Sequence, residues 1–475
     1  MLRRLAIGGA ALGAGWAISR WLDASRRARG RLPHVSEPVN AYLHARTRIL
    51  VLGGGFAGLE VARALDMRLR GGENGDDVSV LVVDRGSSLL FTPLLWTVAD
   101  GRSDPNDVVV PIRMFQRGRR FHVLHAEVQR IDLDRCVVET AAGPRPYDVL
   151  VLAPGSVTVM PDLPGLCQHA LIFHTPADAM QLRNRLIDAV EAAHNAQDPS
   201  ERQEWLTFVV SGGGDTGVEL GAVIHDYLRN GLFAAYPWLA DAPVRVVLVG
   251  RAPRLVPMSD LQTSGVVQRV LESEGVEVLT GVSVECVTDH SVRTSAQEIP
   301  ARTVFWAAGI TAPPVVRDLP VEHAPNGAVM VDDHLRVPGH PEVHVVGDSA
   351  WAFDAVTHAP IPPTAQAALH MGRYVGRTIV AQMRGQDAGP FCFRPLGHLD
   401  LLGAHTGVAR VRPVLFTGIA AWLLWHGYYL YRLPAWRNRT HLTLDWVLSG
   451  IAGRETSELR LGSQPENCRA PVAAA

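Results

Sequence analysis

Residues Arg48 to Glu60 read Arg-Ile-Leu-Val-Leu-Gly-Gly-Gly-Phe-Ala-Gly-Leu-Glu, and much of the architecture can be inferred from them. Ile49 to Leu52 is a short, wholly apolar run, as expected of a strand that is buried on both faces of a sheet. Gly53, Gly55 and Gly58 follow at G-x-G-x-x-G spacing. These glycines permit a tight turn, the approach of a pyrophosphate to the backbone, and close packing of the next helix. The stretch therefore predicts a strand, a turn and a helix that bind a dinucleotide at the helix N-terminus.

The residues beyond this turn support the same prediction. Glu60 to Arg70 contains many helix formers and no proline, and a second apolar run, Val78 to Val83, ends in Asp84. An acidic residue at about this distance from the glycines binds the ribose hydroxyls of a dinucleotide. The alternative, a glycine-rich loop without a ligand, does not require a strand, a helix and an acid in this order. We therefore expect Asp84 to bind the cofactor.

The same pattern occurs a second time in the chain. Phe208 to Ser211 is an apolar run, Gly212, Gly214 and Gly217 repeat the glycine spacing, and Val218 to Asn230 has the composition of a helix. Two such turns predict two dinucleotides, one held as a prosthetic group and the other exchanged. This internal repeat favours an electron-transfer flavoenzyme of the α/β class, built from two doubly wound Rossmann-type domains.

Length and composition narrow the class of protein further. The chain has 475 residues, of which 47% are hydrophobic, and this length suits about three domains of ordinary size. A formal net charge of -2 argues against a general nucleic-acid binder. The cysteines are odd in number and no two stand at C-x-x-C spacing, so we expect neither a disulfide framework nor a zinc site, and no bound metal.

The N-terminus carries an apolar segment between arginines. Leu5 to Ile18 spans roughly 14 residues, fewer than the roughly 20 that a membrane-spanning helix needs. We favour an uncleaved anchor or interfacial helix. An export signal, which Arg3 and Arg4 before the apolar run suggest, and an incorrectly assigned start are the alternatives. Leu32 to Ala45 is predicted to be a linker.

The C-terminal region has the composition of a membrane-docking segment. Leu415 to Tyr431 is mostly apolar and rich in the aromatic residues that are typical of a membrane interface. His441 to Ile451 is a second stretch with apolar periodicity, and Arg432, Arg437 and Arg439 would face anionic headgroups. A buried dimer interface is the alternative for this region, and the two roles are compatible.

Several motifs resemble those of the type II NADH dehydrogenases, which are single-chain, non-pumping NADH:quinone oxidoreductases of the pyridine nucleotide-disulfide oxidoreductase-like superfamily. The resembling segments follow the family's order between about Arg48 and Gly453. They are Gly53-Gly-Gly-Phe-Ala-Gly58, Leu90-Phe-Thr-Pro-Leu-Leu95, Pro111-Ile-Arg113, Val209-Val-Ser-Gly-Gly-Gly-Asp-Thr-Gly-Val-Glu219, Val304-Phe-Trp-Ala-Ala-Gly-Ile310 and Pro362-Pro-Thr-Ala-Gln-Ala-Ala-Leu-His370. The resemblance implies tightly bound FAD, NADH and/or NADPH as substrate, and a membrane quinone as electron acceptor. It also implies that the second dinucleotide-binding domain is inserted in the first, and that C-terminal helices dock on the membrane.

The resemblance further implies which residues form the site. In the wider flavoprotein family, the Asp of a strand ending in Gly-Asp binds the ribityl chain of the flavin, and Asp348 takes that place. The implied cofactor-binding residues are Gly53, Gly55, Phe56, Ala57, Gly58, Asp84, Gly212, Gly214, Asp215, Thr216, Gly217, Arg251, Gly309, Gly347, Asp348, Ala365 and Gln366.

Three residues are candidates for a catalytic role: Glu219, Gln366 and His370. The resemblance places Glu219 near the nicotinamide and the flavin, and stabilisation of a helix N-terminus is its simpler role. His370 stands where the family usually has a second glutamine, and it shares a helix face with Gln366. It is a candidate for a hydrogen bond or proton transfer to the quinone, and an ordinary helical histidine is the alternative.

The second nucleotide site departs from the family at the end of its second strand. The related enzymes generally have Glu where this chain has Gly250, and Arg251 and Arg254 stand beside the gap. A carboxylate there binds the ribose 2′-hydroxyl of NADH, whereas arginine pairs with a 2′-phosphate. We therefore expect NADPH to be accepted at least comparably to NADH; solvated loop arginines are the alternative.

These inferences lead to a division of the chain. We expect an anchor and linker over residues 1–46, an FAD-binding domain over 47–165 and 325–390, and an NAD(P)H-binding domain over 166–324. A membrane-associated segment over 391–455 and a disordered tail over 456–475 would complete it. The expected partners are a membrane quinone, the bilayer surface and a second copy of the chain in a homodimer. The expected location is the cytoplasmic face of the inner or plasma membrane.

Two other functions remain open at the level of sequence. A sulfide:quinone oxidoreductase needs a cysteine pair at the flavin, and Cys167 and Cys392 would have to meet there although neither lies in a redox motif. A non-catalytic FAD-binding redox sensor is the other alternative. Disulfide reductases are disfavoured because their cysteine pair follows the first helix and no cysteine precedes Cys136.

Overall fold

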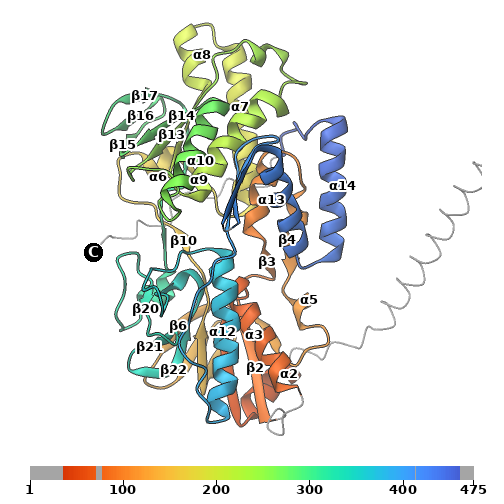
Figure 1. Ribbon diagram of the computed structural model, residues 1–475, viewed down its shortest axis with the longest axis vertical. Helices are drawn as coiled ribbons and strands as arrows, with labels where there is room; N and C mark the ends of the chain where they lie inside the picture. The colour runs from red at the N-terminus through yellow and green to blue at the C-terminus, as the bar shows by residue number, and fades with distance from the viewer. Residues whose placement is uncertain (1–35, 71–76, 412, 460–475) are drawn as a thin grey trace, which may run out of the picture.

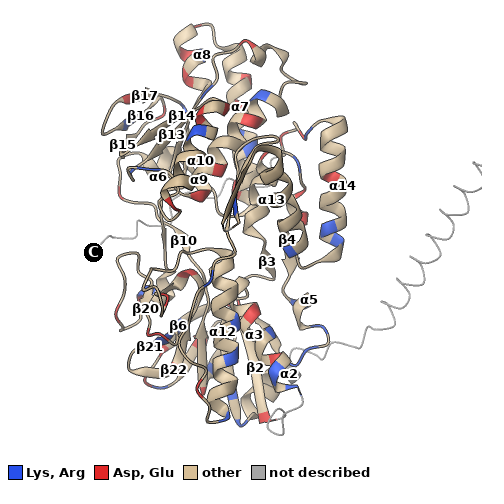
Figure 2. Cartoon of the chain, in the orientation of Figure 1, with Lys and Arg blue, Asp and Glu red and all other residues tan. Residues whose placement is uncertain are grey.

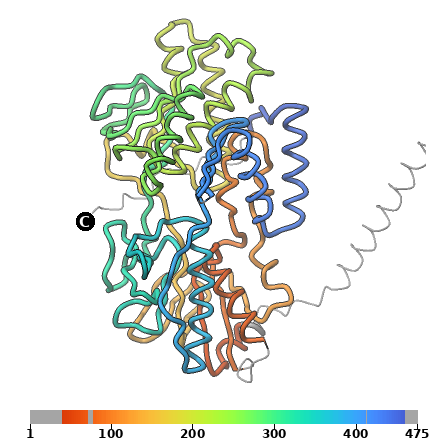
Figure 3. The backbone as a smooth tube through the Cα atoms, in the orientation of Figure 1, coloured from red at the N-terminus to blue at the C-terminus, as the bar shows by residue number. Residues whose placement is uncertain are grey.

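A computed structural model describes residues 36–70, 77–411 and 413–459 of the chain. Two parallel sheets, one above the other in Figure 1, form the centres of two layered α/β units. The colours in Figure 3 show that the chain builds part of the lower unit, crosses to the upper unit, and returns to complete the lower one. It ends in two helices, α13 (Gly418–Arg432) and α14 (Trp436–Ala452), that lie beside both. The predicted class, with the second doubly wound unit inserted in the first, is confirmed.

The first sheet has six strands in the order β21-β22-β9-β1-β2-β5, and only the pair β21 and β22 is antiparallel. Its strands are β1 (Thr47–Leu52), β2 (Val78–Asp84), β5 (His122–His125), β9 (Val149–Leu152), β21 (Arg336–Val337) and β22 (His340–Val345). Ile49 and Val51 point into one apolar core, and Leu50 and Leu52 point into another on the opposite face. The unbroken apolar run is thus explained by burial of both faces.

Helices α3 (Phe56–Leu69) and α12 (Ala365–Met383) cover one face of this sheet and cross in direct contact. Two glycines of α12 make the crossing close. A Cβ atom at Gly372 would lie 2.4 Å from the carbonyl oxygen of Ala57, and one at Gly376 would lie 2.6 Å from Cβ of Ala64. Helix α12 therefore packs directly behind the first glycine turn.

The second sheet has five parallel strands in the order β11-β18-β12-β13-β14. They are β11 (Ala170–Ile172), β12 (Thr207–Ser211), β13 (Arg245–Gly250), β14 (Val276–Thr280) and β18 (Thr303–Trp306). Helices α9 (Asp215–Asp226), α7 (Pro176–Asn195) and α10 (Leu261–Glu274) belong to this unit. The predicted helix over 218–230 is α9 followed by a π-helical turn, η4 (Tyr227–Gly231).

Smaller sheets and helices complete the two units. The small sheets contain β3 (Ser88–Leu90) and β4 (Val109–Pro111), β6 (Val128–Asp132), β7 (Val137–Thr140) and β8 (Gly143–Pro146), β10 (Val157–Thr158) and β19 (Ile310–Thr311), β15 (Val284–Val287), β16 (Ser291–Thr294) and β17 (Glu298–Pro300), and β20 (Val329–Met330) and β23 (Ala350–Trp351). The remaining helices and helical turns are α2 (Ser36–His44), α4 (Leu95–Ala99), α5 (Arg113–Gln116), α6 (Leu166–His169), α8 (Pro199–Trp205), α11 (Pro314–Arg317), η2 (Thr92–Leu94), η3 (Pro105–Asp107), η5 (Pro237–Ala240) and η6 (Gly347–Ser349).

The C-terminal segment begins with a three-stranded antiparallel sheet of β24 (His398–Leu401), β25 (Gly407–Val411) and β26 (Val414–Thr417). The predicted apolar segment from Leu415 therefore starts in a strand rather than in a helix. Trp425 of α13 is buried against Trp96, with ring centroids 5.1 Å apart, whereas α14 is anchored through Asn438. The Asn438 amide donates to the backbone carbonyls of three residues between 106 and 109.

The outer sides of α13 and α14 are apolar and exposed. The exposed large hydrophobic side chains of these helices are Ile419, Leu423, Leu424, Tyr431, Trp436, Leu444, Val447, Leu448 and Ile451. We call this set the apolar face. None of the helices within the described ranges combines the length and the apolar character that crossing a bilayer requires.

Two expectations about the chain ends need correction. Part of the predicted linker over Leu32 to Ala45 is the helix α2, and Tyr42 is fully buried there, with its hydroxyl donating to the carbonyl of Pro146. The start of the predicted disordered tail makes defined contacts, because Leu459 exchanges hydrogen bonds with Asn184. The predicted anchor at Leu5 to Ile18 and residues 460–475 lie outside the described residues.

Candidate active site between the two sheets

The first glycine turn joins β1 to α3, and two of its three glycines leave no room for a side chain. Gly53 has φ of +104°, and a Cβ atom there would lie 2.1 Å from the carbonyl oxygen of Ala153. A Cβ atom at Gly58 would lie 1.9 Å from the carbonyl oxygen of Gly53, whereas one at Gly55 would meet no atom within 4 Å. Only the middle glycine faces open space, at the N-terminus of α3, where a pyrophosphate is expected to bind.

The second glycine turn joins β12 to α9 and repeats this geometry. Gly212 has φ of +139°, and a Cβ atom there would lie 2.5 Å from the carbonyl oxygen of Ala307. A Cβ atom at Gly217 would lie 1.8 Å from the carbonyl oxygen of Gly212, and one at Gly214 would meet nothing within 4 Å. The two turns therefore have equivalent geometry. Each follows the carboxyl end of a strand and has room for an anion at its middle glycine, and we call them the first and the second cradle.

The predicted acids of the first unit lie next to its turn. Both carboxylate oxygens of Asp84 accept backbone N–H groups, one from Gly54 and one from Gly86, each at 2.5 Å. Asp348 lies in η6, and its carboxylate accepts the hydroxyl of Ser156 at 2.8 Å. Burial raises the pKa of Asp348. The turn at Gly347 lies against Ala57, so Asp348 is held beside the first cradle.

The end of β13 lacks an acid, as the sequence indicates. A Cβ atom at Gly250 would lie 3.3 Å from Cα of Gly213, which shows that a side chain there would press on the second turn. Arg251 is exposed beside it. Arg254 is tied into its own loop, where its guanidinium donates to the carbonyls of Pro257 and Ser259.

The other predicted residues surround the two cradles. Phe56 and Ala57 begin α3, and Asp215 and Thr216 begin α9, where Thr216 is exposed. Gly309 follows β18 with φ of +87°. Ala365 and Gln366 begin α12, and Oε1 of Gln366 accepts the N–H of Leu396 at 3.1 Å.

Glu219 lies in a cluster of ionisable groups with Asp215, Asp400 and His398. The N–H of Leu401 donates to Oε1 of Glu219 at 3.3 Å. Burial raises the pKa of Glu219 well above its usual value, and the nearby Asp400 adds to the shift. Burial also raises the pKa of Asp215 to about 6, again with a contribution from Asp400. The surroundings of Glu219 therefore favour the protonated form of its carboxyl group.

His398 and Asp400 form the charged partner of these acids. Their side chains form an ion pair with Nε2 and Oδ2 2.5 Å apart, and Asp400 is only 1% exposed. Burial alone would lower the pKa of His398, but Asp400 outweighs it and the pKa rises to about 9. The other oxygen of Asp400, Oδ1, has no hydrogen-bond partner in the described structure.

The sequence analysis missed His398 and Asp400. Both lie on β24. The chain from Leu396, which contacts Gln366, to Leu401, which contacts Glu219, spans at most about 17 Å if it is fully extended. A signal was present: the alternation His398-Leu-Asp400 puts two ionisable side chains on one face of a strand.

The structure does not place the two helical candidates, Gln366 and His370, in one pocket. His370 lines a shallow pocket with Tyr374, Arg377 and Cys392, and its ring lies edge-on to Phe393, with centroids 5.5 Å apart. Burial lowers its pKa, and Arg373 and Arg432 lower it further. Its neighbour Leu369 points instead into a larger pocket.

This larger pocket, of about 480 Å³, lies between α3, α5, α12 and the turn that joins α13 to α14. We call it the turn pocket. Phe56 and Leu59 of α3, Phe91 and Leu369 form part of its wall. Phe91 contacts both Phe56 and Tyr429, with ring centroids 5.5 and 6.2 Å apart. The pocket thus extends from the first glycine turn to the C-terminal helices.

Cys167 and Cys392, the two cysteines considered for sulfide oxidation, are in different states. Cys167 is disulfide-bonded whereas Cys392 is free, so these two are not joined to one another.

The open cradles fit FAD and a nicotinamide dinucleotide, because each leaves space for a pyrophosphate at its middle glycine alone. Asp348 adds a buried carboxylate beside the first cradle that is able to accept the hydroxyl of a polyol. The donor set therefore suits a tightly held flavin in the first unit.

Comparison with known proteins agrees with this geometry. Residues 47–372 match the model of the pyridine nucleotide-disulphide oxidoreductases, and residues 396–455 match that of the NDH2 C-terminal domain. The type II NADH:quinone oxidoreductase Ndh of Mycobacterium tuberculosis is 31% identical over 86% of this chain and 89% of its own length. The demethylphylloquinone reductase NdbB of Synechocystis is 29% identical over 85% and 96%.

A solved structure has the same fold. NDH2 from Plasmodium falciparum, determined in complex with NADH, superposes with a TM-score of 0.76 over 86% of this chain and 99% of its own, at 19% sequence identity. The chain belongs to the pyridine nucleotide-disulphide oxidoreductase family and, within it, to the type II NADH:quinone oxidoreductases.

Proposed function

We propose that this protein oxidises NAD(P)H through bound FAD and reduces a membrane quinone without pumping protons. The observation that carries the proposal is the pair of equivalent open cradles, with the cluster of ionisable side chains around Glu219 beside the second. We retain residues 47–165 and 325–390 as the FAD-binding part and 166–324 as the NAD(P)H-binding part.

When bound, FAD supplies the acceptor of the hydride and the donor of two electrons to the quinone. Gly55 and the N-terminus of α3 would hold its pyrophosphate, while Asp84 and Asp348 would hold its ribose and ribityl hydroxyls. Gly214 and the N-terminus of α9 would hold the pyrophosphate of the nicotinamide dinucleotide.

The reaction consumes one proton from solution for each quinone, because the hydride carries two electrons and one proton while the quinol gains two of each. Burial and the nearby Asp400 raise the pKa of Glu219, so its carboxyl group is the candidate that holds and releases this proton. The carboxylate of Asp400 raises the affinity of Glu219 for the proton, and its ion-pair partner His398 partly opposes this effect.

We propose that the quinone approaches through the turn pocket. Its apolar wall, with Phe56 and Leu369, leads toward the first glycine turn, and its opening lies beside the apolar face. Gln366 and His370 are proposed to position the quinone from α12. His370 lines the neighbouring pocket rather than the turn pocket, so its effect on the quinone would be indirect.

The apolar face is proposed to dock on the bilayer, with the nucleotide-binding sheets on the cytoplasmic side. The support is the set of exposed apolar side chains on α13 and α14 next to arginines at the helix ends (Figure 2). A homodimer that buries part of this face is compatible with docking and is proposed as well, and light scattering of the protein in detergent measures the number of copies.

We also propose that NADPH is accepted at least comparably to NADH. The support is the absence of an acid at Gly250, the tight space there, and the exposed Arg251. A ratio of kcat/KM that strongly favours NADH would contradict this part of the proposal.

An anaerobic experiment tests the whole scheme. The purified protein should be yellow, NADH and NADPH should each bleach it, and a membrane quinone should restore the colour. A yellow protein that neither nicotinamide bleaches would indicate a flavin-binding sensor instead.

Glu219→Gln is the sharpest variant for this test. Glutamine keeps an acceptor for the N–H of Leu401 but cannot give up a proton, so bleaching should persist while quinone reduction slows about 100-fold. His370→Ala should slow only the reoxidation by quinone. Reoxidation at the unchanged rate in either variant would remove that residue from the mechanism.

A further inference from the structure

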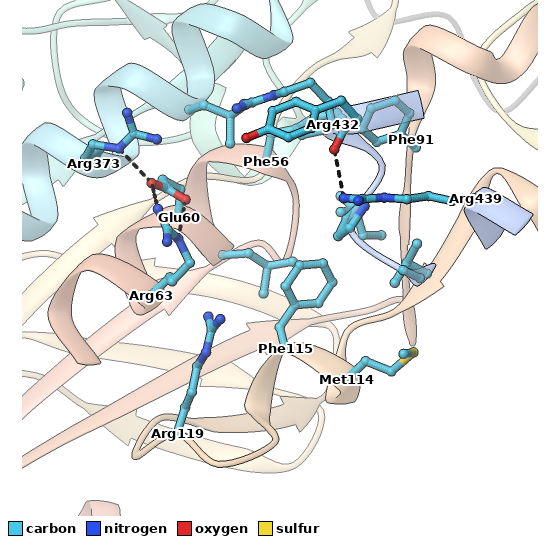
Figure 4. Close-up of a pocket in the computed structure, with 17 residues that line it drawn as sticks. Phe56, Glu60, Arg63, Phe91, Met114, Phe115, Arg119, Arg373, Arg432 and Arg439 are labelled. Carbon is cyan, nitrogen blue, oxygen red and sulfur yellow. Dashed lines mark hydrogen bonds and ion pairs between the residues drawn. The ribbon is translucent and has the colours of Figure 1, made fainter. Parts of the chain in front are cut away.

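The turn pocket is strongly basic. Five arginines line it, Arg63, Arg119, Arg373, Arg432 and Arg439, against a single acid, Glu60. Figure 4 shows these arginines around the pocket, with the rings of Phe56, Phe91 and Phe115 between them. A neutral quinone carries no negative charge, so quinone binding does not account for the arginines of this pocket.

Not all of this charge is satisfied within the protein. Glu60 bonds Arg63 and Arg373, at 2.7 and 2.9 Å, and is therefore fully engaged. Arg439 donates to the carbonyls of Tyr431 and Leu433. Among the described residues, no carboxylate lies within ion-pair distance of Arg119 or Arg432. Nη1 of Arg119 is buried without a hydrogen-bond partner there.

The opening of the pocket continues into the apolar face. Tyr431 and Pro434 line the pocket, and Tyr431 is 73% exposed. Trp436, 65% exposed, begins α14 directly after the pocket residue Ala435. On the opposite side Met114 is also exposed. A charged cavity is thus bordered by side chains that suit acyl chains.

The chemistry of the basic residues points to a phosphate group. Every one of the 45 basic residues of the chain is an arginine, so the sequence contains no lysine. The planar guanidinium binds phosphate oxygens in pairs and is more weakly hydrated than an ammonium group, which favours binding at a partly buried site.

We propose that the turn pocket binds the headgroup phosphate of an anionic phospholipid, with its acyl chains lying along the apolar face. The inference rests on the proposed membrane docking. Charge complementarity selects an anion, and the apolar border selects a lipid over a soluble phosphate. The bound headgroup would join α3 and α12 to the α13–α14 turn, at the opening through which quinone is proposed to pass.

Binding of the holoenzyme to vesicles tests this. The probes are vesicles of phosphatidylcholine alone and vesicles in which phosphatidylglycerol replaces part of it, and co-sedimentation measures the bound fraction. Arg119→Gln and Arg432→Gln remove the two arginines without a carboxylate partner. Arg117→Gln is the matched control, because Arg117 is exposed, lies two residues from Arg119 and does not line the pocket.

We expect Arg119→Gln and Arg432→Gln each to weaken binding to the phosphatidylglycerol vesicles at least tenfold, and Arg117→Gln to weaken it less than about threefold. Equal losses in all three variants would show that only diffuse surface charge matters and would overturn the proposal. Binding at the wild-type level by both pocket variants would also overturn it. Displacement from the vesicles by millimolar glycerol phosphate would identify a soluble phosphate as the occupant and also overturn it.

Flavin absorbance and bleaching by NAD(P)H separate this inference from the proposed function. If the wild-type enzyme is bleached and reduces quinone while lipid selectivity is absent, only the lipid site is wrong. If bleaching itself fails, the proposed function is wrong. If Arg119→Gln loses its flavin, vesicle binding by Arg432→Gln tests the lipid site instead, because Arg432 lies at the end of α13 and not in the FAD-binding unit.

Discussion

At the scale of single residues, the site depends on charges that lie far apart in the sequence. Glu219 lies on α9, whereas Asp400, which raises its proton affinity, and His398, which opposes this effect, lie on β24. Neither partner changes the composition of its segment enough to stand out. The glycines and Asp84 were predictable because their roles are local, set by a turn and by one neighbouring strand. The charge cluster was not, because it exists only after the C-terminal segment has packed on the second unit.

The ion pair of His398 and Asp400 leads to a prediction about pH. The pKa of His398 is about 9 in the folded protein, against about 6.5 in the unfolded chain. A raised pKa contributes stability that is complete below pH 6.5 and is lost as the pH rises through 9. Denaturant titration should therefore show the wild-type enzyme losing stability between pH 6.5 and pH 9.5.

His398→Gln should remove this part of the pH dependence, because glutamine does not titrate. The variant should be less stable than the wild type at pH 6.5 and closer to it at pH 9.5. Parallel stability curves for the two proteins over this range would contradict the prediction.

At the scale of elements, the crossing of α12 on α3 connects the last part of the first unit to its glycine turn. The sequence predicted a helix at both places, since Glu60 to Arg70 contains many helix formers and Gln366 and His370 have the spacing of one helix face. It did not predict their contact, since that depends on Gly372 and Gly376 facing α3. The boundary at Leu415 was wrong for a related reason: an apolar run fits a strand or a helix equally, and pairing of β26 with β25 decides for the strand.

Gly372→Ala should destabilise this crossing. The added Cβ atom would lie 2.4 Å from the carbonyl oxygen of Ala57, so backbone must move, at a cost of about 2 kcal/mol. Because Ala57 belongs to the first turn, the variant should also retain less FAD after gel filtration.

Gly265→Ala is the matched control for this helix substitution. Gly265 is also within a helix, α10, but its Cβ atom would make only an ordinary contact, 3.6 Å from Arg269. We expect unchanged or slightly higher stability there. A similar loss in both variants would show that the effect comes from the helices themselves and not from the crossing.

At the scale of the whole molecule, a buried network of four charges joins three parts of the chain. Arg102 and Arg454 both bond Asp226 at the end of α9, at 2.7 and 2.6 Å, and Asp100 lies beside them. The backbone continues the contact, since the N–H of Glu455 donates to the carbonyl of Gly101 and the hydroxyl of Tyr227 donates to that of Glu455. The sequence did not predict this network, because nothing local indicates a partner for Arg454.

Arg454→Met should destabilise the protein by about 3 kcal/mol, because it leaves the buried Asp226 and Asp100 with Arg102 alone. Denaturant titration of the holoenzyme measures the change. The comparison is Arg293→Met, which breaks an exposed pair with Glu285 and should cost less than about 1 kcal/mol. Equal effects would mean that the network adds no more than a surface pair.

This four-charge network also has a consequence for biosynthesis. A ribosome adds about 5 to 20 residues per second, so Asp100 waits roughly 20 to 70 seconds before Arg454 has been polymerised. During that interval both nucleotide-binding units are synthesised while Arg454, one of the two arginines that pair with Asp100 and Asp226, is still missing. The complete network therefore forms only after Arg454 has been synthesised, and a nascent chain that stalls before it would leave these acids with Arg102 alone.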